Sequence, residues 1–262
     1  MLHKKCCVAM MLFVFLLGIN CGKDASLSPE ESALFYRLRK IIYEENKYEV
    51  FTYSGELLTK VERFSDDQLT SWISFTYDQD SILLSEESYK KFSADSPFLL
   101  YQYSYQSNGH IDKAEVLSKN SQDEDYVPFR TQIFTTNEKS QIVMIEVWDS
   151  ETQLYRSEFE YNSDGNIMRT KIFLFDALYQ KEEYEYNAGL NPLYRIRNVI
   201  FSEPCFSKNT AKVSIRTYMS GEKNVNYMQS SYTYNRAYFP TSKKTCLFSA
   251  SDTTELNIRY EY

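Results

Sequence analysis

The chain has 262 residues, of which 25% are charged and 16% are aromatic, and its formal net charge is −7. Basic residues are scattered along this acidic chain, so it has neither the basic footprint of a nucleic-acid-binding protein nor a polybasic patch for anionic lipid. The length is sufficient to bury a substantial core in a large domain.

The N-terminus has the pattern of an export signal. Lys4 and Lys5 precede an apolar run over residues 8–18, which is too short to span a bilayer comfortably and is followed by Cys21. We predict a signal peptide at residues 1–20. Its removal takes away two lysines and changes the net charge from −7 to −9.

The segment Leu17-Gly18-Ile19-Asn20-Cys21 resembles the lipobox of bacterial lipoproteins, in the relaxed form found in spirochaetes. It departs from the common form because Leu17 lies four residues before the cysteine and Asn20 precedes it directly. The resemblance implies a lipid (palmitate) anchor on Cys21, a short tether over residues 21–28 and a location at the outer membrane, on its periplasmic or surface face. Cleavage by ordinary signal peptidase and an uncleaved anchor remain open.

Residues 29–46 are predicted to form one amphipathic helix. Ser28 would cap it, Pro29 would occupy its first position and Glu31 would close a capping box. The helix would pack its apolar face against the rest of the domain or against a partner. That face comprises Leu34, Phe35, Leu38, Ile41 and Ile42.

Residues 47–262 alternate apolar and polar side chains, which predicts an all-β domain of repeated hairpins. Each unit is a strand ending in an aromatic residue, a polar turn and a return strand, with anchors mostly 24 to 31 residues apart. Clear copies are Phe51-Thr52-Tyr53, Phe75-Thr76-Tyr77-Asp78, Tyr103-Ser104-Tyr105, Phe159-Glu160-Tyr161-Asn162 and Tyr184-Glu185-Tyr186-Asn187, and a weaker one is Phe134-Thr135-Thr136-Asn137.

These units resemble the tyrosine–aspartate (YD) repeats of Rhs-type proteins, which implies stacked hairpins but no function. Glycines are expected in the turns and prolines between the strands. The residues concerned are Gly55, Gly109, Gly165, Gly189, Gly221, Pro97, Pro128, Pro192, Pro204 and Pro240.

Aromatic residues occupy one face of the strands and acids the other, as in an antiparallel meander with one packed face. So many strands must curve, which predicts a curved sheet or an open barrel. The tyrosine face would form a core of aromatic ladders, or it would stack on the rings of a bound glycan. The possible stacking residues are Tyr103, Tyr105, Tyr161, Tyr184 and Tyr186. An integral outer-membrane barrel, with tyrosines outward and acids inward, is an alternative.

Two cysteines remain once the signal peptide and the lipid site are set aside. Cys205 and Cys246 would form a disulfide in an oxidising compartment, or they would be two buried thiols.

The sequence carries little catalytic chemistry. His110 is the one histidine after the signal peptide, and no metal-binding or cofactor motif is present. We therefore expect a non-enzymatic binding or structural module without a cofactor, with the membrane and a glycan or an envelope or host protein as partners. The alternative from another class is a carbohydrate-active hydrolase that uses paired carboxylates such as Glu158 and Glu160.

Overall fold

A computed structural model describes residues 37–90, 98–196, 206–219, 224–248 and 253–262. These residues form sixteen strands and one short 3-10 helix, η1 (Pro192–Ile196). The strands are β1 (Lys40–Glu44), β2 (Lys47–Ser54), β3 (Leu57–Ser65), β4 (Gln68–Tyr77), β5 (Leu83–Lys90), β6 (Phe98–Tyr105), β7 (Ile111–Lys119), β8 (Val127–Thr136), β9 (Ile142–Asp149), β10 (Thr152–Tyr161), β11 (Ile167–Leu174), β12 (Ala177–Leu190), β13 (Asn209–Tyr218), β14 (Asn224–Tyr234), β15 (Pro240–Phe248) and β16 (Thr253–Glu261).

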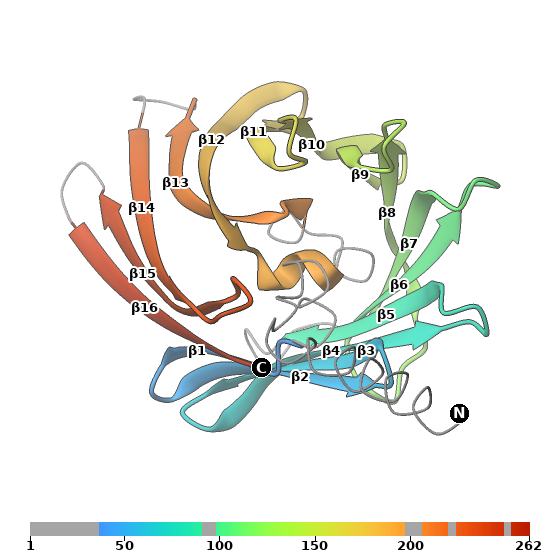
Figure 1. Cartoon of the computed structure of the whole chain (residues 1–262). Helices are drawn as coiled ribbons and strands as arrows, with labels where there is room; N and C mark the ends of the chain where they lie inside the picture. The colour runs from blue at the N-terminus through green and yellow to red at the C-terminus, as the bar shows by residue number, and fades with distance from the viewer. Residues whose placement is uncertain (1–36, 91–97, 197–205, 220–223, 249–252) are drawn as a thin grey trace, which may run out of the picture. The chain divides into compact units, whose positions relative to one another are not determined.

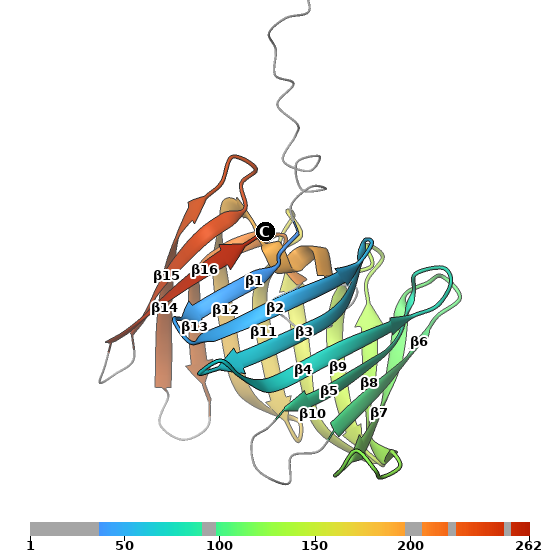
Figure 2. The ribbon, with the colours of Figure 1, turned by 90° about the horizontal axis from the view of Figure 1, so that it is seen from below.

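The strands form a closed antiparallel barrel in which each strand pairs with its neighbours in the chain (Figures 1 and 2). β1 closes the ring, because Ile41 lies opposite Tyr260 of β16 and Glu49 of β2. The expected all-β meander of hairpins is confirmed. It is closed rather than open, which leaves no sheet edge exposed to another chain.

The predicted N-terminal helix is wrong where the structure describes it. Residues 40–44 form β1, and residues 29–36 lie outside the described part of the chain. Ile41 and Ile42, which we placed on one helical face, point to opposite faces of the strand, and both are buried. Pairing with strands on both sides of β1 overrides the helical spacing of these residues.

Of the four predicted turn glycines that the structure describes, three are confirmed and one is wrong. Gly55, Gly109 and Gly165 have positive φ and lie in turns, whereas Gly189 lies within β12, which continues to Leu190. The prolines were expected between strands, and among the described ones this is confirmed for Pro192 and wrong for Pro128 and Pro240. Pro128 is in β8, Pro192 begins η1 and Pro240 begins β15, while Pro97, Pro204 and Gly221 lie outside the described residues.

The lumen side of the wall is apolar and aromatic. The strand register places Phe51, Phe75, Phe134 and Phe159 on one continuous face, where they are buried. Tyrosines of the same strands pack against this cluster. The predicted segregation of aromatics to one face is therefore confirmed, and that face points inward.

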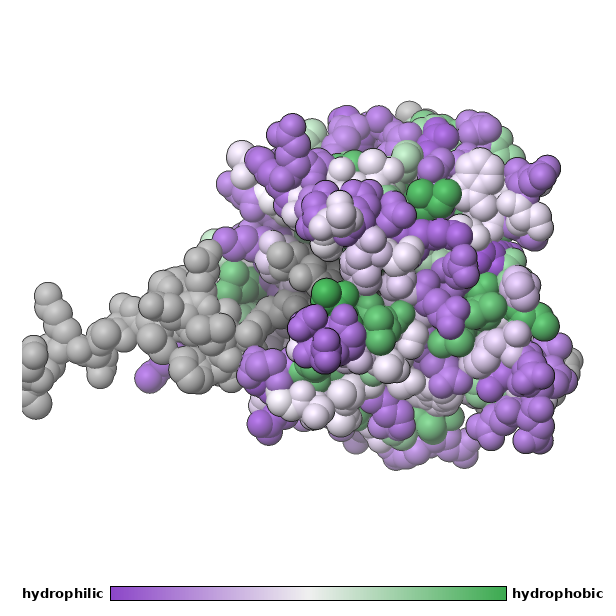
Figure 3. Space-filling view, turned by 90° about the vertical axis from the view of Figure 1, so that its right-hand side faces the viewer, coloured by the Kyte–Doolittle hydropathy of each residue, from purple (hydrophilic) through white to green (hydrophobic). Residues whose placement is uncertain are grey.

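The outer side of the wall carries ion pairs. Glu160 of β10 binds Lys171 and Arg169 of β11 at 2.8 and 2.7 Å, and Arg169 also reaches Glu183 of β12 at 3.1 Å. Further pairs link Lys60 to Glu62, Lys113 to Glu115, Arg156 to Glu158, Lys181 to Glu183 and Lys244 to Glu255. Figure 3 shows one side of the barrel, where hydrophilic side chains cover most of the surface and apolar ones form small patches.

Candidate ligand-binding lumen

One rim of the barrel is organised by tyrosine hydroxyls. A tyrosine at or near the end of an even-numbered strand points into the lumen. Its hydroxyl donates a hydrogen bond to a main-chain carbonyl at or near the start of the strand before it. The bond recurs in seven of the eight even-numbered strands described. The donor–acceptor pairs are Tyr53–Leu38, Tyr77–Leu58, Tyr105–Leu83, Tyr161–Ile142, Tyr186–Ile167, Tyr232–Ala211 and Tyr262–Pro240, at 2.6 to 3.0 Å. We call this end of the barrel the tyrosine rim.

The turns of the tyrosine rim share one geometry. In the turn after β10, Asn162 N donates to the carbonyl of Asn166, and the Asn162 side chain accepts from the amides of residues 164 and 166. Asp78, Asn137 and Asn235 repeat this pattern. An Asx side chain that binds its own turn explains why the repeated motif ends in aspartate or asparagine.

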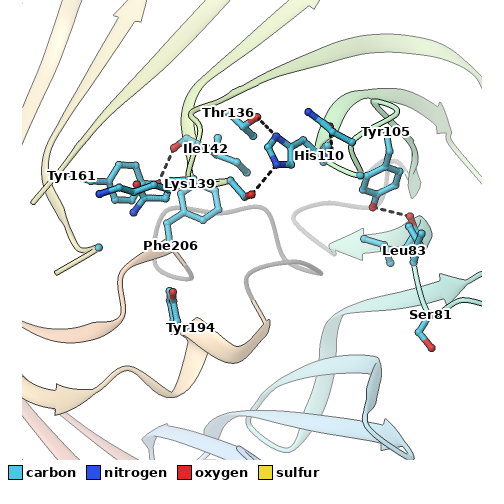
Figure 4. Close-up of a pocket in the computed structure, with 17 residues that line it drawn as sticks. Ser81, Leu83, Tyr105, His110, Thr136, Lys139, Ile142, Tyr161, Tyr194 and Phe206 are labelled. Atoms are coloured by element: carbon cyan, nitrogen blue, oxygen red, sulfur yellow. Dashed lines mark hydrogen bonds between the residues drawn. The ribbon is translucent and has the colours of Figure 1, made fainter. Parts of the chain in front are cut away.

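The ring of tyrosines is interrupted at β8. Thr136 stands where the other repeats have tyrosine, and its hydroxyl lies 3.0 Å from Nδ1 of His110. The other ring nitrogen of His110 lies 2.7 Å from Oγ of Ser140 (Figure 4). His110 is therefore held between two hydroxyls at the gap.

A pocket of about 550 Å³ opens at this gap, and we call it the histidine chamber. Its walls come from the turns that follow β4, β6, β8 and β10, and Tyr194 of η1 and Phe206 line its inner side (Figure 4). Phe206 packs edge-on against Phe159 of β10, with ring centroids 5.4 Å apart. η1 lies inside the ring of strands (Figure 1), and Phe206 belongs to the buried core of the lumen.

A second pocket of about 420 Å³ lies on the other side of η1, and we call it the lysine chamber. Leu193 of η1 lines it, together with lumen-facing residues of β1 and of β11 to β16. Its walls combine the rings of Tyr184, Tyr232 and Tyr260 with hydroxyl groups such as that of Ser214. Ser214 Oγ is buried and has no hydrogen-bond partner among the described residues.

The lysine chamber carries one net positive charge. Glu182, which is only 3% exposed, forms an ion pair with Arg216 at 2.9 Å. Lys243 has no anionic partner among the described residues, and its ammonium lies 5.8 Å from the centre of the Tyr232 ring. Burial lowers the pKa of Lys243, because the charged ammonium is removed from water without a compensating carboxylate.

A buried carboxyl also faces the lumen, from β5. Burial raises the pKa of Glu86 to about 7, and a hydrogen bond from the Tyr103 hydroxyl at 3.1 Å opposes this shift. The Glu86 carboxyl therefore changes charge near neutral pH.

The structure brings all five predicted stacking tyrosines into the lumen but divides them. Tyr105 and Tyr161 line the histidine chamber, Tyr184 and Tyr186 line the lysine chamber, and Tyr103 contacts Glu86. Sequence reasoning missed Lys243, Arg216 and Ser214, because alternation along β13 and β15 separates the two faces of each strand without showing which face points inward.

The remaining predicted residues lie outside the lumen or outside the described chain. Glu158 and Glu160 are on the outer wall, each in ion pairs, and a hydrogen bond from Lys171 lowers the pKa of Glu160. Cys246 lies on the outer face, 3.7 Å from Glu255, and forms no disulfide with another described residue. Cys205 and Cys21 are not among the described residues, so the disulfide and the lipid site stay predictions.

No helix in the described segments has the length and apolar character needed to cross a membrane. Among the same residues, no cluster of three or more histidine, cysteine or acidic side chains could hold a metal ion.

No family model and no curated protein sequence matches the chain. Solved structures do match its fold. A porin-like protein from Bacteroides uniformis aligns with a TM-score of 0.54 and 11% identity, covering 86% of this chain and 96% of that one. A porin-like protein from Bacteroides vulgatus aligns with a TM-score of 0.50 and 9% identity, covering 87% and 99%. The chain therefore has the fold of porin-like β-barrels.

Proposed function

We propose that the protein is a porin-like barrel of the outer membrane that binds a small polar molecule, such as a sugar, within its lumen. The observation that carries this proposal is the pair of chambers inside the closed wall, of about 550 and 420 Å³. Both volumes fall in the range of small-molecule sites, about 300–1,000 Å³. Tyrosine rings supply stacking surfaces for a sugar ring, and hydroxyls and charged groups supply hydrogen bonds.

Binding without turnover is part of the proposal. The Ser140–His110 pair has the geometry of a nucleophile and its base, but the second nitrogen of His110 meets the Thr136 hydroxyl instead of a carboxylate. The paired carboxylates considered for a hydrolase are neutralised by cations on the outer wall. A general acid needs a raised pKa, whereas the pKa of Glu160 is lowered.

The test is the thermal unfolding of the full chain, purified in detergent, with a panel of neutral and charged mono- and disaccharides. A bound sugar should raise the unfolding temperature, and the rise should keep growing with the logarithm of its concentration above Kd. Tyr184→Ala should abolish this effect, because the ring lines the lysine chamber. Tyr227→Ala removes a ring from the outer face and should leave it unchanged. A panel without any effect on the wild type would refute the proposal.

The mode of membrane attachment has two candidates. The porin-like fold favours an integral barrel, and an aromatic band circles the outer face near the rim opposite the tyrosines. Its ring pairs are Tyr48–Phe64 and Tyr89–Phe98, which are stacked, and Tyr227–Phe248, which is tilted. A lipid-facing wall, however, needs an apolar band about 25 Å tall between two such girdles. The ion pairs of β10 to β12 interrupt that band, and each lipid-facing charge at mid-membrane costs about 2–4 kcal/mol.

We therefore favour a water-exposed wall and attachment through the lipid predicted on Cys21. In Cys21→Ala, the barrel should leave the membrane fraction on carbonate extraction. Retention of this variant in the membrane would support the integral barrel instead.

A further inference from the structure

Lys243 is the one charged residue lining the lysine chamber that has no ion-pair partner among the described residues. The register of β15 with β14 and β16 places it opposite Tyr232 and Ile258, on the lumen face. A lysine enclosed by aromatic and aliphatic side chains loses hydration, and only an opposite charge restores that loss fully. The described residues supply none, since Glu182 is already engaged by Arg216.

We propose that the lysine chamber is a site for a sugar-sized ligand carrying an anionic group, a carboxylate or a phosphate, with Lys243 as the residue that binds the anion. This inference rests on the proposed function and names the class of ligand for one of its two chambers. The Lys243 ammonium offers three donors, which suits either anion.

The other walls of the chamber fit the remainder of such a ligand. The rings of Tyr184 and Tyr260 provide flat apolar surfaces. Ser214 provides a buried hydroxyl without a partner among the described residues, which a ligand hydroxyl would satisfy. The histidine chamber differs in that it presents His110 and Ser140 already bonded to each other.

The neighbouring lysine is a matched control. Lys244 follows Lys243 directly, points to the outer face and forms an ion pair with Glu255 at 3.0 Å. Lys243→Gln and Lys244→Gln therefore remove the same charge from the same strand, one inside the lumen and one outside.

The experiment is calorimetric titration of the full chain with glucuronate, glucose 6-phosphate and glucose. We expect at least one anionic sugar to bind more tightly than glucose, and Lys243→Gln to weaken that binding by about tenfold to a hundredfold. Lys244→Gln should bind like the wild type, and the affinity for glucose should be the same in all three proteins. Comparison of the two anions tells a carboxylate site from a phosphate site.

Two outcomes separate the proposals. Binding of glucose without preference for either anion, or equal loss in both lysine variants, would overturn the anion site and leave the sugar-binding lumen intact. Absence of binding by all three sugars would overturn both.

If Lys243→Gln does not fold, acylation of the wild-type protein decides the question. Glucuronate or glucose 6-phosphate should protect Lys243 but not Lys244, as measured by peptide mass spectrometry, and equal labelling of Lys243 with and without both sugars would refute the site.

Discussion

The bonds of the tyrosine rim can be tested by removing one hydroxyl. Tyr161→Phe deletes the donor that lies 2.8 Å from the Ile142 carbonyl and keeps the ring in place. A neutral hydrogen bond contributes about 0.5–1.5 kcal/mol net, so the free energy of unfolding should fall by about 1 kcal/mol. Tyr186→Phe should cost more, because the Tyr186 hydroxyl bonds both Ile167 and Ser207.

The control is Tyr227→Phe. The Tyr227 ring packs at a tilt against Phe248 on the outer face, and no hydrogen bond of its hydroxyl occurs among the described residues. This change should alter the free energy of unfolding by less than about 0.5 kcal/mol. Rim variants at separate strands should add, because sites more than about 7–10 Å apart usually do.

The assay is urea unfolding followed by tyrosine and tryptophan fluorescence. With a denaturant dependence of about 2–3 kcal/mol per molar, a loss of 1 kcal/mol shifts the midpoint by about 0.3–0.5 M. Equal midpoints for Tyr161→Phe and Tyr227→Phe would refute the argument that the rim hydroxyls hold successive strands together.

Three further changes probe other parts of the barrel. Gly189→Ala should destabilise by about 1–3 kcal/mol, because the new methyl would overlap the ring of Tyr234; unfolding that matches the wild type would mean that this ring is not fixed. Phe175 has φ of +45° and is 69% exposed at a hairpin tip, so Phe175→Gly should stabilise by about 1 kcal/mol, and a loss of stability would contradict this. The pKa of the Glu86 carboxyl is about 7 in the folded state against an ordinary value of 4.5, so the native state binds the proton more tightly than the unfolded chain does. The wild type should therefore lose stability relative to Glu86→Gln as pH rises from about 5 to about 8. A stability difference that does not vary over that interval would show that the carboxyl is already ionised.

Local pattern predicted most of the wall. Alternation along each strand and the polar turns predicted the meander and the gathering of aromatic residues on one face, because both depend on neighbours in sequence. Closure depended on the pairing of Ile41 with Tyr260, two positions at opposite ends of the chain. The helical spacing around Ile41 led to the wrong prediction of a helix, because strand partners far away in sequence decide whether β1 forms.

Only part of the lumen could be predicted from the sequence. Thr136 was visible as a weak copy of the repeat, and its departure from tyrosine marks the gap that holds His110. The pair Lys243-Lys244 guaranteed one lysine on each face of a strand, but composition could not assign the faces. Only the register with β14, which places Lys243 opposite Tyr232, does so.

The two faces of the wall together locate the function. The charged side chains of the outer surface already pair with one another, as Lys171 does with Glu160, and single exposed ion pairs add little stability or recognition. The inner surface is different, because a ring of sixteen strands encloses more space than its own side chains fill. η1 and Phe206 occupy part of that space and leave chambers on either side. Lys243 and Ser214, which lack an anionic partner and a hydrogen-bond partner among the described residues, lie in one of those chambers, so the lumen is where a ligand gains the most free energy by binding.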